Sequence, residues 1–158
     1  MMKRRLFLSL SLAALALAPL LAAGPAAAAD KPSADEVREL TLEAARVLQS
    51  HDLGQARRTF HADGPFRFGE IYVNVIDGNG TWLVYPPNPR HEGKSVLNVR
   101  DADGKLLVQD IVRTARDKGE GWVEYRWLNP VSNRIEPKMS YVKQVPGKDM
   151  VVYVGIYR

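Results

Sequence analysis

The first 29 residues decide how much of this chain remains to fold. Three basic residues, Lys3 to Arg5, precede an apolar run from Leu6 to Ala23, and small residues follow at Ala27 to Ala29. This order is typical of a secretory signal peptide. We therefore predict a signal peptide over residues 1–29 and one domain over residues 30–158, exported to the periplasm. Retention of the segment as a membrane anchor stays open, and so does the choice between general and twin-arginine export.

The charge of the remaining chain argues against nucleic acid as a partner. The full sequence has 22 basic and 18 acidic residues, a formal net charge of +4. The predicted signal peptide contains three of the basic residues and no acidic one, so the domain is nearly neutral. A nearly neutral domain lacks the positive surface that a polyanion requires.

The sequence contains no cysteine. This absence excludes disulfides, thiol nucleophiles and cysteine-bound zinc, although an exported protein could form disulfides. The stability of the domain must therefore come from packing, and a chain of about 130 residues buries enough surface for one core.

Helical patterns occur in the first part of the domain. Ser33 and Glu36 form a capping-box pattern, and apolar residues then recur at steps of three and four, which predicts a helix to about Ser50. A shorter helix is predicted over Gln55 to Phe60, before the Gly64-Pro65 loop.

Strand patterns follow from Ile71 onward. Residues 71–76 and 81–85 read as a β-hairpin, and residues 105–118 as a helix that ends an irregular insertion. Strands are predicted over residues 122–128, 138–145 and 150–157. This order of elements predicts an α+β domain: a five-stranded antiparallel sheet, a long N-terminal helix and a helical insertion between the second and third strands.

Alternate residues of a strand face opposite sides of a sheet. On the last strand, Val152, Val154 and Ile156 form an aliphatic set that suits packing against the N-terminal helix. We expect the other face of the sheet to be aromatic. The side chains assigned to it are Tyr125, Trp127, Met139, Tyr141, Tyr153 and Tyr157.

Two interpretations of the aromatic face stay open. It could line a pocket that binds a small molecule, or the tyrosines could simply pack as core. Lys138, at the start of a strand, could pair with a ligand carboxylate that the tyrosines also contact. Lys138 and Tyr141 are three residues apart, so both reach one ligand only if the strand start bulges.

Motifs for catalysis or metal binding are weak. His51, His61 and His91 lie far apart, and no zinc-protease motif, nucleophile elbow or phosphate-binding loop occurs. We predict no enzyme activity, no catalytic residue, no metal site and no cofactor.

Several spaced motifs resemble the single Cache domains of bacterial extracytoplasmic sensors, and together they cover most of the domain. They are Tyr72 to Val75, Gly93 to Ser95, Arg100 to Lys105, Gly121 to Trp127, Asn129-Pro130, Glu136 to Val142 and Val154 to Tyr157. The resemblance implies a PAS-like fold that binds small organic acids or similar metabolites between sheet and insertion. Tyr85-Pro86 stands where family members often carry His-Pro.

The resemblance also implies a set of ligand-binding residues. They are Tyr72, Tyr85, Tyr125, Trp127, Lys138 and Tyr141. Most family members are sensor parts of membrane receptors. The leading hypothesis is therefore a stand-alone periplasmic sensor that binds a small carboxylate and passes the bound state to a partner, such as a membrane receptor, kinase or transporter component. The alternative is an accessory subunit with a vestigial pocket.

Overall fold

The computed structural model describes residues 31–158, so the predicted signal peptide lies outside the described residues. Three α-helices, one 3-10 helix and six strands form the described part. They are α1 (Ala34–Ser50), α2 (Leu53–His61), β1 (Arg67–Phe68), β2 (Ile71–Asp77), β3 (Trp82–Val84), η1 (Pro89–His91), α3 (Leu107–Lys118), β4 (Glu120–Leu128), β5 (Ile135–Gln144) and β6 (Met150–Tyr157).

One antiparallel sheet organises the domain. Its strand order is β1-β2-β6-β5-β4, with β3 paired to β2 on the side of the hairpin turn. The last strand, β6, is therefore central and pairs with β2 on one side and with β5 on the other. This arrangement confirms the predicted antiparallel α+β fold, with the two-residue strand β1 added to the five strands expected.

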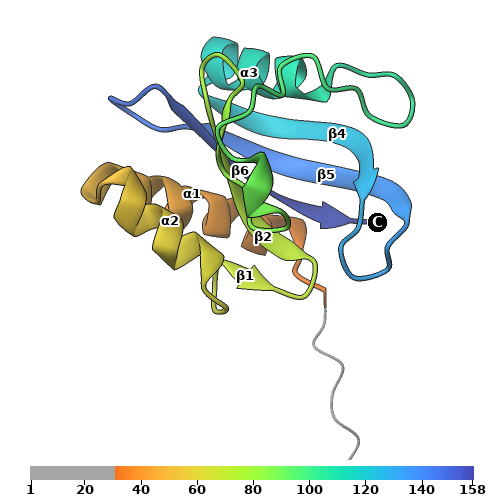
Figure 1. The fold of residues 1–158 in the computed structure, drawn as a ribbon, viewed down its shortest axis with the longest axis horizontal. Coiled ribbons are helices and arrows are strands. Elements are labelled where there is room, and N and C mark those ends of the chain that lie inside the picture. The colour runs from red at the N-terminus through yellow and green to blue at the C-terminus, as the bar shows by residue number, and fades with distance from the viewer. Residues whose placement is uncertain (1–30) are drawn as a thin grey trace, which may run out of the picture. The chain divides into compact units, whose positions relative to one another are not determined.

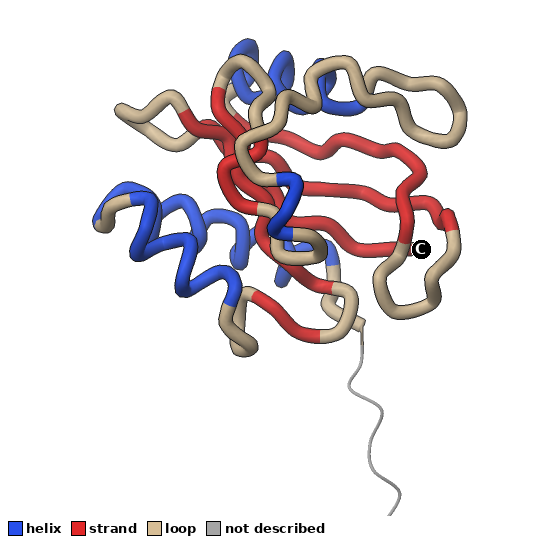
Figure 2. Tube along the Cα trace, viewed as in Figure 1, coloured by secondary structure: helices blue, strands red, loops and turns tan. Residues whose placement is uncertain are grey.

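The sheet lies between helices on its two faces, as Figures 1 and 2 show, and a hydrophobic cluster lies on each face. Helices α1 and α2 cover one face, where Val37, Leu48 and Phe60 pack on Val152 and Val154 of β6. Helix α3 and the insertion before it cover the other face, together with the aromatic residues of the strands. Among residues 31–158, the buried cluster on the α1 side includes no tyrosine or tryptophan, whereas the α3 side combines aliphatic residues with the buried rings of Trp82, Tyr125 and Tyr153.

Helix α1 begins where the capping-box pattern predicts. The Glu36 amide donates to Ser33 Oγ at 3.2 Å, and the Ser33 amide donates to Glu36 Oε2 at 2.7 Å. The helix is amphipathic, and its buried residues are Val37, Thr41, Ala44, Ala45 and Leu48. This face fixes α1 against β5 and β6.

Strand β4 lies at the edge of the sheet, and side chains cover part of its free backbone. Asp101 Oδ2 accepts from the Arg126 amide at 3.0 Å, and Lys105 Nζ donates to the Glu124 carbonyl at 2.5 Å. These bonds fasten the end of the insertion to the edge strand. They also blunt an edge that could otherwise pair with another chain.

Within residues 31–158, no helix combines the length and the apolar character needed to cross a bilayer.

The capping box gives a first prediction. Ser33→Ala removes the side-chain acceptor at the helix start and should lower the free energy of unfolding by about 1 kcal/mol. Ser50→Ala, at the exposed end of the same helix, is the matched control and should change it by less than about 0.5 kcal/mol. Urea denaturation of both variants measures the difference. Equal values would show that the capping bonds contribute nothing to stability.

Candidate functional site

Four side chains form a row across the aromatic face of the sheet. Tyr125 of β4 pairs with Lys138 of β5, and Lys138 pairs with Tyr157 of β6. Cross-strand partners project from the same face of a sheet, so these three side chains lie beside one another. Tyr72 of β2 completes the row, since its hydroxyl lies 3.2 Å from the Tyr157 hydroxyl.

Lys138 is the polar centre of this row. Its side chain lies inside the protein, with the residue only 2% exposed. Nζ lies 2.8 Å from Tyr72 Oη and 3.2 Å from Tyr157 Oη, and 4.0 and 4.3 Å from the centres of the same two rings. The Tyr157 hydroxyl donates to the Leu128 carbonyl at 2.7 Å. No carboxylate of the described residues pairs with the amine.

Gly155 provides the space that Lys138 occupies. It lies on β6 opposite Ser140, on the same face of the sheet. A Cβ atom at this position would meet Lys138 Cε at 2.5 Å and the Met139 carbonyl at 2.9 Å, besides Ser140 Oγ. The glycine therefore lets the aliphatic part of the lysine cross the strand surface.

Burial shifts the pKa values of all four side chains in the row. Loss of water holds the pKa of Lys138 well below its ordinary value, although the charge of Glu70 opposes the shift. Burial raises the pKa of Tyr72 and Tyr125 well above the ordinary value for a phenol, and it also raises that of Tyr157. The phenols are therefore neutral hydrogen-bonding groups at any physiological pH.

An inner cavity lies beside the row, between the sheet and α3. Its volume is about 10 Å³, roughly the space of one water molecule. The lining residues are Tyr72, Asn74, Trp82, Tyr85, Val99, Leu107, Val108, Tyr125, Trp127 and Tyr153. In this conformation the inner cavity is too small for an organic acid.

A larger outer cavity of about 600 Å³ adjoins the inner one. Four side chains line both and form the partition between them: Trp82, Tyr85, Val99 and Trp127. Trp82 and Tyr85 stack with ring centres 4.0 Å apart, and Trp127 Nε1 donates to Tyr85 Oη at 3.4 Å. Tyr85 and Trp127 thus stand between the two cavities.

Glu92 fastens the insertion to α2 beside this partition. Its Oε1 accepts from the Tyr85 amide at 2.8 Å and lies 2.7 Å from His61 Nε2. Its Oε2 lies 3.3 Å from Arg57 Nε. The carboxylate thus fixes the backbone of Tyr85, while the side chain of Tyr85 is held only by contacts with other rings and by Trp127.

The structure brings five of the six predicted site residues together. The inner cavity is lined by Tyr72, Tyr85, Tyr125 and Trp127. Lys138 does not line it, but its amine contacts the Tyr72 hydroxyl at 2.8 Å. Their roles in ligand binding stay predictions.

Tyr141, the sixth predicted residue, lies on the opposite face of the sheet. Its hydroxyl donates to Glu120 Oε1 at 2.8 Å and accepts from Arg38 Nε of α1 at 3.3 Å. The expectation that Tyr141 shares a face with Tyr125 was wrong. Tyr125 pairs with Lys138, so the even-numbered residues of β5 face the cavity and no bulge brings Tyr141 to the same side.

Sequence reasoning missed several residues around the inner cavity. Asn74 and Trp82 were not selected as site residues, and Tyr153 was placed on the face but not in the site. Asn74 is a polar residue within a strand of β-branched residues, and this sequence signal could have marked it. In the fold it is 2% exposed, as expected of a polar group with a specific role. Glu92 had no such signal, because its role depends on the folding of the insertion over α2.

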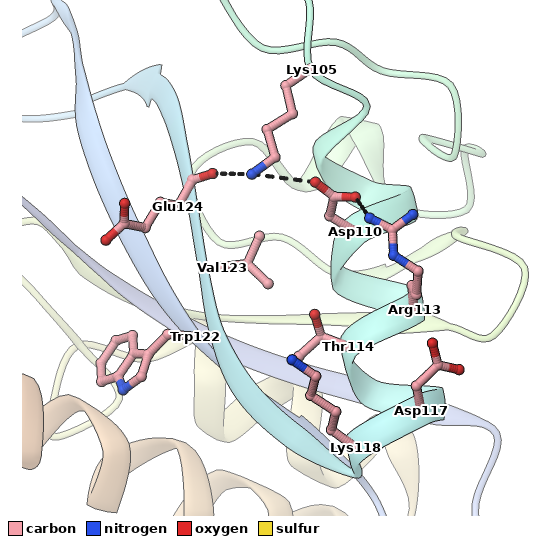
Figure 3. Close-up of a pocket in the computed structure, with 9 residues that line it drawn as sticks. All are labelled: Lys105, Asp110, Arg113, Thr114, Asp117, Lys118, Trp122, Val123 and Glu124. Carbon is pink, nitrogen blue, oxygen red and sulfur yellow. Dashed lines mark hydrogen bonds and ion pairs between the residues drawn. The ribbon is translucent and has the colours of Figure 1, made fainter.

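A polar pocket of about 260 Å³ between α3 and β4 offers a contrasting site (Figure 3). Lys105 Nζ lies 3.3 Å from Asp110 Oδ2, and the other oxygen of Asp110 pairs with Arg113. These charges satisfy one another at the surface. Such a pocket is a weaker candidate for a ligand than the inner cavity, whose lining residue Tyr72 contacts an amine that has no anion.

Among residues 31–158, no group of three or more histidine and carboxylate side chains is arranged to hold a metal ion.

The geometry agrees with comparisons with known proteins. The profile of the family described as single Cache domain 2 matches residues 33–158. The chain belongs to this family. Cache domains are sensor domains that bind small ligands, and the sequence relatives found are signalling proteins.

Two sequence relatives are much longer signalling proteins. The sensor histidine kinase MctS of Rhizobium johnstonii is 28% identical over 128 residues, which cover 81% of this chain and 24% of the kinase. The methyl-accepting chemotaxis protein McpP of Pseudomonas putida is 28% identical over 86 residues, 54% of this chain and 16% of the relative. The Cache chain thus spans less than a quarter of either relative.

Solved structures share the fold. A Cache chemosensory domain described for its carboxylic acid recognition superimposes with a TM-score of 0.70 at 23% identity, covering 78% of this chain and 91% of the other. The periplasmic sensor domain of a chemotaxis protein gives a TM-score of 0.61 at 32% identity, covering 78% and 88%. At 23% identity, the match to the chemosensory domain shows a shared fold alone.

The space at Gly155 gives a second prediction. Gly155→Ala forces a methyl group against Lys138 and the backbone of β5 and should lower the free energy of unfolding by about 1 to 3 kcal/mol. Gly54→Ala in α2 is the matched control, because among the described residues its Cβ would meet only side-chain atoms, Asp52 Oδ1 at 3.1 Å and an Arg58 guanidinium nitrogen at 3.8 Å, and no backbone atom outside its own helix. That variant should retain full stability. Urea denaturation measures both, and an unaffected Gly155→Ala protein would contradict the close packing.

Proposed function

We propose that this protein is an exported, stand-alone Cache sensor that acts in the periplasm. It binds a small carboxylic acid beside Lys138 and passes the bound state to a partner protein, without catalysing a reaction. The observation that carries the proposal is a buried amine held by two phenols with no carboxylate in contact. A ligand carboxylate would supply the missing anion.

The surrounding groups suit such a ligand. Charge-assisted hydrogen bonds from an ammonium are among the stronger polar contacts, about 1.5 to 3 kcal/mol each. Phenols at Tyr72 and Tyr125 can donate to carboxylate oxygens, and the indole of Trp127 and the aliphatic side chains of α3 suit a short apolar tail. The Cache domain with known carboxylic acid recognition supports the same class of ligand by analogy.

Binding requires an opening of the partition. The inner cavity holds about one water molecule, so a carboxylate must displace Tyr85 or Trp127 from their present positions. The outer cavity gives the displaced rings room and gives the ligand a route. Ligand binding would then close or reshape the insertion around the acid, a change that a partner can detect.

A thermal-shift screen tests the ligand. Acetate, propionate, lactate, pyruvate and succinate are added separately to the protein of residues 30–158. At a hundred times its dissociation constant, a true ligand stabilises the fold by about 2.7 kcal/mol, a rise of several degrees in Tm. Lys138→Met should abolish this rise without lowering the stability of the ligand-free protein, because it removes a buried amine that has no anionic partner.

Lys143→Met is the matched control on the same strand. Lys143 faces the opposite side of the sheet and pairs with Glu120 at 2.6 Å, so its loss should leave the ligand effect intact. Absence of stabilisation by every acid, together with a stable copurifying partner, would support the accessory-subunit alternative instead.

An exposed apolar end of the domain supports the proposed partner. The large hydrophobic side chains that are most exposed among the described residues lie in β1 and around the β4–β5 turn: Phe68, Leu128, Val131 and Ile135. Figure 1 shows the β1–β2 and β4–β5 turns at the same lower edge, and Asn129 Nδ2 donates to Glu70 Oε2 between them. We propose that this end contacts a membrane receptor, kinase or transporter component.

Site-specific crosslinking tests this contact. A photoreactive residue at Val131, which is 67% exposed, should crosslink to a membrane protein in cells, and the yield should change when the stabilising acid is added. The same residue placed at exposed Asp149, in the β5–β6 turn, is the control and should give no such product. Equal products from both positions would contradict the proposed surface.

A further inference from the structure

Lys138, Tyr72 and Tyr157 form a closed hydrogen-bonded triangle inside the domain. The three heavy atoms lie 2.8, 3.2 and 3.2 Å apart. Building on the proposed function, we infer that the protein binds its carboxylate together with one proton, which Lys138 takes up from solvent as the ligand arrives. The ligand-free protein would thus hold a neutral amine, and the complex an ammonium paired with the acid.

The hydrogen-bond pattern suits a neutral amine. The only proton of the Tyr157 hydroxyl goes to the Leu128 carbonyl at 2.7 Å, so Tyr157 Oη can only accept within the triangle. A neutral amine has two N–H groups, which donate to Tyr72 Oη at 2.8 Å and to Tyr157 Oη at 3.2 Å. The Tyr72 hydroxyl then donates to Tyr157 Oη at 3.2 Å. All three edges of the triangle are therefore hydrogen bonds when the amine is neutral, and no anion is needed.

An ammonium in the same place would lack compensation. Its three N–H groups would face two phenol oxygens and the faces of two rings. Ring faces attract a cation, but they replace only part of the hydration that a fully buried ammonium loses. The lowered pKa of Lys138, which results from this burial, agrees with the inference.

The acids nearest the triangle are already engaged. Glu70, in the β1–β2 turn, accepts from the Tyr157 amide and from Asn129, and lies 3.6 Å from Lys31 Nζ. Glu136, at the start of β5, accepts from Asn129 and Ser132. Neither carboxylate contacts Lys138 directly.

The other elements around Lys138 also leave it without a counterion. Helix α3 contributes the apolar residues Leu107 and Val108, and Tyr85 and Tyr125 are neutral phenols. A shallow pocket at the sheet edge brings further charged groups near Lys138: Asp101, Asp103, Lys105, Glu124, Arg126 and Arg158. These form bonds among themselves, as in the pairs Arg158–Glu124 and Arg126–Asp103.

Binding of the carboxylate gives Lys138 the anion that the free protein lacks. Neutral amine, carboxylate anion and one proton combine to give an ammonium carboxylate pair, with a new N–H bond and no bond broken in the ligand. Because the anion stabilises the ammonium, the pKa of Lys138 is higher in the complex than in the free protein. Between these two pKa values the apparent affinity falls as pH rises, by up to tenfold for each pH unit, and outside them it is constant.

Calorimetry in two buffers tests the inference. Propionate, or the acid of the thermal-shift panel that stabilises most, is titrated at pH 8 in phosphate and in Tris, whose ionisation enthalpies differ. The difference in heat should correspond to close to one proton taken up for each ligand. Lys143→Met should give the same uptake. Binding without proton uptake, and with an affinity unchanged between pH 6 and 9, would overturn the inference and leave the proposed function intact.

A second measurement needs no ligand. The Cε resonance of Lys138 in ¹³C-lysine-labelled protein, assigned by its absence in Lys138→Met, is followed between pH 5 and 10. It should titrate well below the other lysines, as a neutral amine in the ligand-free protein requires. A Lys138 that titrates together with the surface lysines would overturn the inference, whether or not any acid of the panel binds.

Discussion

Lys138 crosses the surface of β6 through the space that Gly155 leaves open, and its amine ends between two phenols. A buried amine without an anion is costly unless it is neutral or receives a partner, so the surrounding structure must hold it in place. Tyr72, Tyr157 and the Leu128 carbonyl do this through bonds that join β2, β6 and the end of β4. The chemistry of the ligand site therefore depends on the pairing of strands far apart in sequence.

The two faces of the sheet divide structural and proposed ligand-binding roles. On the α1 face, aliphatic side chains pack closely, and the polar group Tyr141-Glu120-Arg38 fastens the helix to the sheet edge. On the α3 face, the rings of Tyr85 and Trp127 separate a small inner cavity from a larger outer one. Glu92 fixes the backbone of Tyr85, whereas the Tyr85 ring is held by its stacking on Trp82 and by the hydrogen bond from Trp127.

Much of the fold could be predicted because its signals are local. The capping box at Ser33, the helical periodicity that follows and the turn residues between strands indicated each main element within a few residues. The two-residue strand β1 had no local signal, since it exists only through its pairing with β2. The family resemblance then supplied the candidate site, and five of its six residues lie together.

The assignment of Tyr141 failed for a reason that no single strand reveals. Alternation within β5 separates Lys138 from Tyr141, but it does not say which of them faces Tyr125. That choice is fixed by the register between β4 and β5, in which Tyr125 opposes Lys138. Register depends on the pairing of whole strands, so the face of a side chain is less predictable than its place in an element.

The central place of β6 has a consequence for how the domain is made. β6 follows both of its neighbours in the chain, so β2 and β5 can join one sheet only after residues 150–157 are available. Until then the aliphatic face of α1 lacks β6, one of the two strands on which it packs, and the chain stays without a complete core. A chain that emerges from the ribosome with its N-terminus first would therefore remain open until β6 had emerged.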